Sequence, residues 1–474
     1  MTRTDLKECF PKAKLDAVKL KGFIGDKPFY KRVLSISVPI MVQNGLTNLV
    51  NLLDNVMVGS LGTESMSGVS IVNQFVFIFN LLVFGAVSAG GIFTAQYHGL
   101  GDTVGIRNTF RFKFLTNLII SAVVIVSFIC FDDELISTFL HSSGSSEELD
   151  LALTLSEGKK YLKIFLIGLV PYAITQVYAS TLRETEETKL PMYASILALA
   201  ANFLLNIVFI FALDMGVRGA AIATVISRFS ELLFIALITH RKSDKYAFVI
   251  GAYRSFKMPR LLVRGILIRG LPLMANEFLW SLSMTLRNQA YSTRGLDAVA
   301  AVNISSVIIN LINVVYMSLG ASIAIIVGER LGSGNIDDAK STANKMLAFS
   351  IFTAICSGVV MALVAPYFPK IYDTTSDARD LAAYMTLVSA AIIPFVSFSY
   401  SAYFTIRTGG RVFLTFMLDS GIMWAIIVPL ALILSSYTDI SIWWLYLICQ
   451  GAEIIKLIPG IIILKSGKWA RRLV

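Results

Sequence analysis

The stretch SVPIMVQNGLTNLVNLLDNVMVGSLG, residues 37–62, places a carboxylate, Asp54, inside an apolar run that extends from about Val33 to Val58. Hydrophobic residues make up 55% of the chain and charged residues only 15%, against roughly 25% charged residues in a soluble globular domain. The mean hydropathy of +0.71 is correspondingly high. Because about 20 apolar residues cross a hydrocarbon core of ~30 Å, this stretch predicts a membrane span and the composition predicts a membrane protein.

Eleven further apolar runs of similar length follow along the chain. We therefore predict twelve transmembrane helices and an all-α polytopic fold. The predicted spans are 33–58, 67–93, 110–131, 159–182, 190–213, 217–239, 271–292, 299–326, 346–368, 383–405, 412–434 and 441–464.

Lys and Arg gather in alternate loops, and positively charged loops resist translocation. The basic segments are the two termini together with 98–113 and 240–269, whereas the intervening loop 132–158 is acidic. This pattern predicts a multi-pass protein of the cell membrane with both termini in the cytosol. The net charge of +10 then reflects topology and contact with anionic membrane lipids, and it requires no nucleic-acid partner.

The chain also repeats itself at an offset of 233 residues (272 − 39 = 233). The matching pairs are Pro39 with Pro272, Gly62 with Gly295, Val69 with Val302, Asn80 with Asn313, Gly99 with Gly332 and Gly101 with Gly334. Each half holds six spans, an even number, so both halves start on the same side of the membrane. We expect two pseudo-symmetric six-helix bundles, related by an axis along the membrane normal, with the substrate path between them.

The repeat and the basic loops together predict five parts. They are a cytosolic N-terminal segment (1–32), an N-lobe (33–240), a basic cytoplasmic linker (241–265), a C-lobe (266–464) and a cytosolic tail (465–474).

Several motifs resemble those of the multidrug and toxic compound extrusion (MATE) transporters. They are the quoted first span, TAQYHGLGD and VGERLGSGN after spans two and eight, TLRETEETKLPMYASILALAANFLLNIVFIF across spans four and five, GVRGAAIAT opening span six, GLPLMANEFLWSL in span seven and TIRTGGRVFLTFMLDSGIMWAIIVPLA in spans ten and eleven. The resemblance covers nearly the whole chain and is carried by the order and spacing of these motifs. It implies a V-shaped, two-lobed antiporter that exports organic cations or other amphiphiles against an inward flow of sodium or protons.

An ionisable group at membrane depth costs several kcal/mol, so Asp54 is a functional candidate, with helix-to-helix hydrogen bonding as the plainer alternative. Asn202 and Asn206 lie one helical turn apart in span five, and Thr224 lies near the start of span six. Oxygen donors of this kind suit a hard cation. The resemblance implies that these four residues form a cation or proton site. Many members carry Asp where this chain has Asn206, which leaves H⁺ or Na⁺ as the coupling ion; we lean towards H⁺.

In the C-lobe, Glu277 and Asp419 are candidate substrate-binding carboxylates, although Asp419 is equally well explained as a structural hydrogen-bond acceptor near a helix entrance. Glu453 and Lys456 lie three residues apart and are expected to neutralise one another. Arg287 lies ten residues from Glu277, a rise of ~15 Å, so each of these two side chains needs its own partner.

Pro39 and Pro272 are the hinge candidates, because they form a symmetric pair and an interior proline removes a helical hydrogen bond. A static kink is the plainer interpretation of each.

Enzyme classes find little support in the sequence. It holds three histidines and no HExxH, GxxxxGK[ST] or GxSxG motif. We therefore expect no catalytic residues, no metal and no cofactor beyond the coupling ion, and a monomer whose partners are a small organic cation or amphiphile and the membrane lipids. Two alternatives stay open: a flippase for lipid-linked oligosaccharides or lipid precursors of the same superfamily, and a cation channel.

Overall fold

The computed structural model describes residues 22–130 and 151–474, so most of the predicted N-terminal segment and the acidic part of the loop at 132–150 lie outside the described residues. All regular secondary structure in the described residues is helical. In the first half the helices are α2 (Lys27–Gly59), α3 (Thr63–Leu100), α4 (Thr103–Cys130), α6 (Leu151–Phe165), η1 (Leu166–Gly168), α7 (Leu169–Glu184), α8 (Lys189–Asn206), η2 (Ile207–Ala212) and α9 (Gly216–Arg241).

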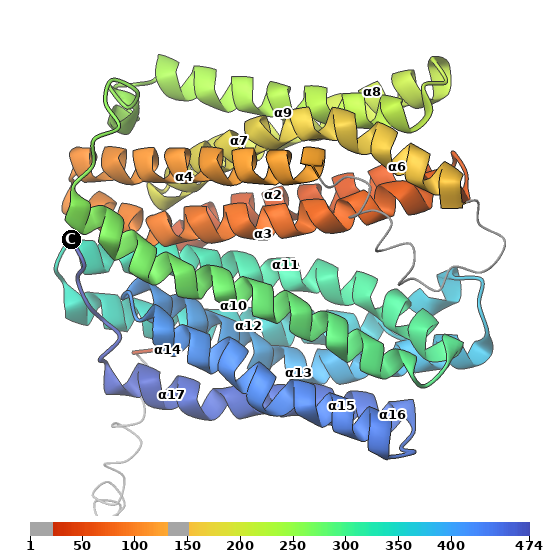
Figure 1. Cartoon of the computed structure of the whole chain (residues 1–474). Helices are drawn as coiled ribbons and strands as arrows, with labels where there is room; N and C mark the ends of the chain where they lie inside the picture. The colour runs from red at the N-terminus through yellow and green to blue at the C-terminus, as the bar shows by residue number, and fades with distance from the viewer. Residues whose placement is uncertain (1–21, 131–150) are drawn as a thin grey trace, which may run out of the picture. The chain divides into compact units, whose positions relative to one another are not determined.

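The second half continues the same pattern of long helices joined by short turns (Figure 1). Its helices are η3 (Ala247–Val249), α10 (Arg260–Ser292), α11 (Leu296–Gly332), α12 (Ile336–Val364), η4 (Phe368–Ile371), α13 (Ser376–Thr408), α14 (Val412–Phe416), η5 (Met417–Gly421), η6 (Met423–Ile427), α15 (Val428–Tyr437), α16 (Ile442–Gly451), η7 (Ala452–Lys456) and α17 (Leu457–Ser466).

Each of the twelve predicted spans overlaps a helix or a series of helical segments in the described residues, which confirms the all-α polytopic fold. Among the described residues, eleven of these segments are long and apolar enough to cross a membrane. The exception is α10, which is 33 residues long but carries Arg260, Arg264, Arg269, Glu277 and Arg287. Most helices extend beyond the predicted bounds, because hydropathy detects only the part of a helix that lies in hydrocarbon.

Contacts group the chain into two compact units. We call Pro39–Phe278 the N-terminal unit, and Met1–Val38 together with Leu279–Val474 the C-terminal unit. The linker 241–265 thus belongs to the N-terminal unit, and α2 and α10 each divide between units. The lobe boundaries of the repeat stay a prediction.

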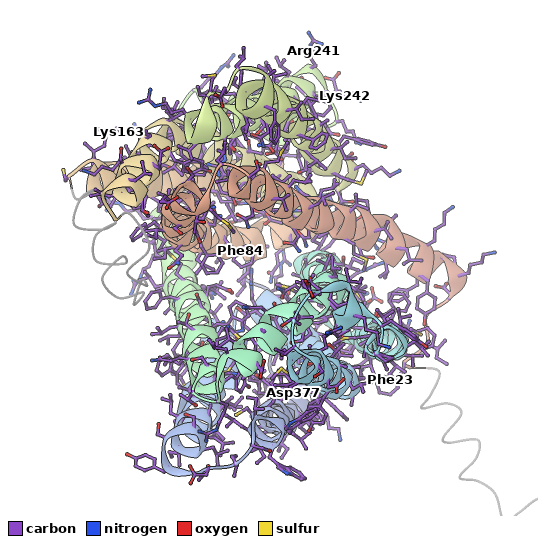
Figure 2. The ribbon with its side chains drawn as sticks, turned by 90° about the vertical axis from the view of Figure 1, so that its right-hand side faces the viewer. Phe23, Phe84, Lys163, Arg241, Lys242 and Asp377 are labelled. Carbon is purple, nitrogen blue, oxygen red and sulfur yellow. The ribbon has the colours of Figure 1, made fainter. Side chains whose placement is uncertain are left out.

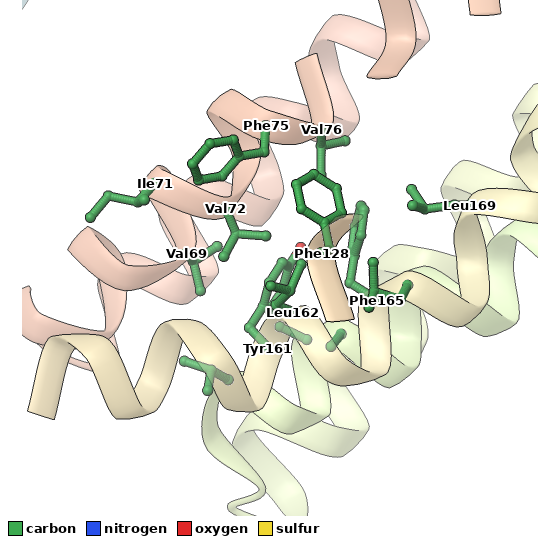
Figure 3. Close-up of a cluster of buried hydrophobic side chains, with 14 of the residues drawn as sticks. Val69, Ile71, Val72, Phe75, Val76, Phe128, Tyr161, Leu162, Phe165 and Leu169 are labelled. Atoms are coloured by element: carbon green, nitrogen blue, oxygen red, sulfur yellow. The ribbon is translucent and has the colours of Figure 1, made fainter. Parts of the chain in front are cut away.

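The N-terminal unit has an apolar core between α3, α6 and the end of α4 (Figure 3). The Phe75 ring meets the Phe128 ring edge-on, with centroids 5.7 Å apart. Helices α3 and α6 approach closely at Gly68 and Gly158, where a Cβ on Gly68 would lie 2.6 Å from a backbone oxygen of α6. This core buries Tyr161 and includes the first turns of α9.

The internal repeat is visible in backbone conformation. Gly62 and Gly295 precede α3 and α11 with φ of 110° and 102°. Gly101 and Gly334 follow the same two helices with φ of 77° and 85°. L side chains rarely adopt such values, so equivalent turns in the two halves require glycine. The offset of 233 residues therefore marks a structural repeat.

Candidate functional site

Three helices of the N-terminal unit bring the four predicted ion-site residues together. Asp54 comes from α2, Asn202 and Asn206 from α8, and Thr224 from α9. The Nδ2 of Asn206 donates to Oδ1 of Asp54 over 2.7 Å and lies 3.2 Å from Oδ1 of Asn202. The Nδ2 of Asn202 donates to Oγ1 of Thr224 over 3.3 Å. Both asparagines are almost completely buried, so the four side chains form one polar cluster at membrane depth.

The direction of these hydrogen bonds matters for what the cluster can bind. The Asn206 amide presents its NH₂ group to the carboxylate, while its Oδ1 is buried and makes no hydrogen bond within the described residues. Asn206 is also the last residue of α8, where the π-helical turn η2 begins. Such π turns occur frequently at functional sites, because the extra residue re-aims neighbouring groups.

Two charged residues of α9, Arg228 and Glu231, extend the cluster and were missed by the sequence analysis. Arg228 lies one turn beyond Thr224. Its guanidinium stacks over Phe165 at 4.3 Å and Tyr172 at 4.9 Å from the ring centroids and donates to the Gly168 carbonyl. It lies close enough to interact electrostatically with Asp54 and Glu231. Both residues fall inside the predicted span 217–239. Charged residues are rare inside membrane spans, so their presence there could have marked them as functional candidates.

Glu231 also belongs to a second group of hydrogen-bonded polar side chains. Ser195 of α8 donates to Glu231 over 2.9 Å, and Gln43 of α2 donates to Ser195 over 3.1 Å. Arg183 of α7 donates to Oε1 of Gln43 over 3.0 Å. Gln43 lies one helical turn after Pro39, so this group ties the start of the α2 segment in the N-terminal unit to α7 and α8.

The C-terminal unit holds a charge tetrad, formed by Arg287, Asp419, Glu453 and Lys456. Arg287 pairs with Glu453 over 2.9 Å. Lys456 pairs with Glu453 over 3.0 Å and with Asp419 over 2.9 Å. The tetrad joins α10, the π-helical turn η5 and the 3₁₀ turn η7.

Glu453 and Lys456 pair as expected from the sequence, but as part of this larger group. The pair exists, but each member also has a second partner. In a 3₁₀ helix, side chains three residues apart eclipse one another, so η7 directs both side chains the same way. Arg287 and Asp419 complete the charge balance.

The two predicted substrate carboxylates differ in their settings. Asp419 lies opposite Lys456, with its side chain 23% exposed. Glu277 is partly buried and lies on α10, next to the end of the N-terminal unit. A role in substrate binding stays a prediction for both. The hinge candidates Pro39 and Pro272 lie inside α2 and α10, and both helices continue through them.

A helical membrane protein with an internal repeat and charged clusters at membrane depth has the features of a secondary transporter. The MatE family model matches residues 39–208 and 272–433, so the chain belongs to the MatE family of membrane transporters.

Among curated relatives, the chain is 23% identical over 462 residues to "Probable multidrug resistance protein NorM" of Thermotoga maritima, covering 94% of each chain. It is 23% identical over 429 residues to "Probable multidrug resistance protein YoeA" of Bacillus subtilis, covering 88% of this chain and 89% of the relative.

Solved structures share the fold. A MATE protein in a straight conformation matches with a TM-score of 0.83 and 21% identity, covering 94% of this chain and 98% of that one. A MATE structure in a bent conformation matches with a TM-score of 0.82 and 22% identity, and also covers 94% of this chain and 98% of that one. A MOP superfamily transporter from Pyrococcus furiosus, whose binding pocket is described as having reverse polarity, matches with a TM-score of 0.79 and 21% identity, again over the same shares.

Proposed function

We propose that the chain is a secondary antiporter that exports organic cations or amphiphilic drugs in exchange for protons, by alternating access of two lobes. Relatives named as multidrug resistance proteins support the cargo class. The sequence contains no GxxxxGK[ST] phosphate-binding motif, which favours an ion gradient as the energy source.

The hydrogen bond from Asn206 to Asp54 carries the preference for protons. A sodium ion needs several oxygen ligands directed at it. Here the amide nearest the carboxylate presents a donor, and Arg228 adds positive charge nearby. Sodium binding would require the Asn206 amide to turn, whereas a proton can bind the carboxylate while the amide keeps its present orientation. The charge of Arg228 opposes both cations, so it does not decide between them.

Proton binding can be coupled to movement because it changes the charge of the cluster. An ionised Asp54 accepts hydrogen bonds from α8, whereas a protonated Asp54 also donates one. The two forms therefore favour different arrangements of α2 against α8, which is the differential interaction that a conformational switch requires.

The alternatives gain less support. A flippase for lipid-linked pyrophosphates would need cationic side chains available to its cargo, whereas Arg287 and Lys456 are both paired with carboxylates. A cation channel would pass the ion down its own gradient without coupling to a drug.

The test is efflux of ethidium and norfloxacin from proteoliposomes, with pH and sodium gradients imposed separately. We expect the pH gradient to drive efflux, and Asp54→Asn to abolish it while the protein stays folded and inserted. Efflux driven by sodium alone would overturn proton coupling. If Asp54→Asn pumps normally under both gradients, Asp54 only joins helices.

A further inference from the structure

The segment from Lys245 to Asn276 has a net positive charge. It contains no Asp or Glu, and its cations are Lys245, Arg254, Lys257, Arg260, Arg264 and Arg269. It includes most of the linker and the first half of α10. Clusters of four to eight Lys and Arg beside a membrane helix attract anionic lipids.

Hydrogen bonds from α4 hold the linker part of this segment in place. Arg107 of α4 donates to the carbonyls of Ala247 and Phe248, and Arg111 donates to those of Gly251 and Ala252. Figure 1 follows the chain from the end of α9 through η3 to the start of α10. The linker therefore has a defined path along the ends of the N-terminal helices.

Lys245 forms an ion pair with Glu187, and this hydrogen bond raises the pKa of Lys245. Arg241 and Lys242, labelled in Figure 2, extend from the end of α9. Both side chains are exposed. The linker thus begins with several cations, of which Lys245 is already neutralised by a partner.

The first half of α10 has two different faces. One face packs on α3: a Cβ on Gly270 would lie 2.8 Å from Cβ of Ala89, and the Arg269 guanidinium lies 5.4 Å from the Phe93 ring centroid. The other face is exposed, with Leu267 at 45% and Leu271 at 65% exposure.

The exposed face forms a groove of about 340 Å³. Its lining consists of Met258, Arg260, Val263, Arg264, Leu267, Ile268 and Leu271. The two arginines lie one turn apart at one end, and apolar side chains follow at helical spacing. From Arg260 to Leu271 the helix rises ~16 Å, so the groove runs from the basic linker to the beginning of the predicted span 271–292.

We propose that this groove is a binding site for an anionic phospholipid. The phosphate lies between Arg260 and Arg264, and one acyl chain follows Val263, Leu267 and Leu271 towards the membrane centre. Charge selects the lipid, because the lining of the groove contains two arginines and no Asp or Glu. The apolar lining distinguishes a lipid from a free phosphate, which would leave the leucines exposed.

Lipid retention measures this site directly. Purified, delipidated full-length protein in detergent is titrated with phosphatidylglycerol or phosphatidylcholine, and bound lipid is counted by native mass spectrometry. We expect one phosphatidylglycerol to bind at least tenfold more tightly than phosphatidylcholine. Inorganic phosphate at millimolar concentration should not displace it. Equal binding of the two lipids, or displacement by phosphate, would overturn the proposal.

Matched variants locate the site. Arg260→Gln with Arg264→Gln should weaken phosphatidylglycerol binding about tenfold or more, and Leu271→Gln should weaken it without changing charge. Lys242→Gln with Lys257→Gln removes the same number of charges from exposed positions of the linker, outside the groove, and should have little effect. Equal losses in both charge pairs would show diffuse attraction instead of a site. All of these side chains are exposed or line an open surface, so unchanged thermal unfolding is expected and serves as the folding control.

This binding assay does not depend on transport. If the Asp54→Asn variant loses drug efflux but retains lipid normally, the proposed antiport has been disrupted without the lipid site. If the Arg260→Gln, Arg264→Gln variant loses lipid but still exports drug, the lipid site has been disrupted without the antiport.

Discussion

Asn206 stands where the resemblance to MATE transporters implies an Asp in many members, and its side chain lies directly beside Asp54. Its amide donates to Asp54, where a second carboxylate would instead share a proton or a cation with it. Asn206→Asp should therefore make efflux sodium-dependent, with an apparent sodium affinity raised by roughly an order of magnitude, since added ligand charge strengthens cation sites. Efflux under a sodium gradient at constant pH measures this.

The control for that change is Asn206→Ala, which removes the same hydrogen bond and adds no acid. It should weaken coupling to protons without introducing sodium dependence. If the aspartate and alanine variants respond alike to sodium, the charge at position 206 does not select the ion.

Glu277 carries a separate prediction. An anionic side chain in a low-dielectric wall attracts cations strongly, so Glu277→Gln should weaken transport of cationic ethidium more than that of a neutral substrate. The ratio of the two KM changes is the measurement. Equal changes for both substrates would assign Glu277 a structural role.

At the scale of helical elements, the charge tetrad should matter most for stability. Glu453 contacts both cations, and its side chain is only 12% exposed. Glu453→Gln leaves Arg287 without its carboxylate, and breaking a buried pair in this way costs about 3–5 kcal/mol. Asp419→Asn should cost less, because Lys456 keeps Glu453. Thermal unfolding in detergent compares them.

Asp337→Asn is the matched control for the tetrad, because that side chain is 98% exposed and its pair with Lys340 spans 3.8 Å. It should leave the melting temperature unchanged. Should Asp419→Asn lower the affinity for cationic drugs while leaving the melting temperature intact, Asp419 would be a substrate ligand after all.

The positions of the membrane-spanning helices could be predicted from the sequence, because each span contains about twenty mostly apolar residues in a row. The resemblance to MATE transporters grouped Asp54, Asn202, Asn206 and Thr224 as candidates, and the structure places these side chains in contact. The pairing of Arg287 with Glu453 could not be predicted, because it depends on which faces of distant helices meet.

The irregular turns were equally invisible in the sequence. No composition signal marks η5 or η7, although these turns carry Asp419, Glu453 and Lys456. By contrast, Arg228 and Glu231 could have been found, since charge inside an apolar span is itself the signal.

At the scale of the whole molecule, α2 passes from one contact unit to the other at Pro39. Proline has no N–H, so the carbonyl four residues earlier lacks its helical hydrogen bond and bending there is easier. Beyond this point Gln43 fastens α2 to Ser195 and Arg183, and Asp54 lies three turns further on. A change at Asp54 can therefore be converted into bending at Pro39.

Pro39→Ala restores the missing hydrogen bond and removes a helix-interior penalty of about 3 kcal/mol. We expect a protein that is at least as stable as the parent. It should export drug several-fold more slowly, because the straight form of α2 is stabilised and the bending step costs more free energy. Pro272→Ala, at the equivalent position of the repeat, is the matched comparison and tests whether α10 bends in the same way. Efflux rates and melting temperatures of both variants are measured together. Normal efflux from the Pro39→Ala protein would mean that Pro39 marks a fixed kink and that movement of the lobes originates elsewhere.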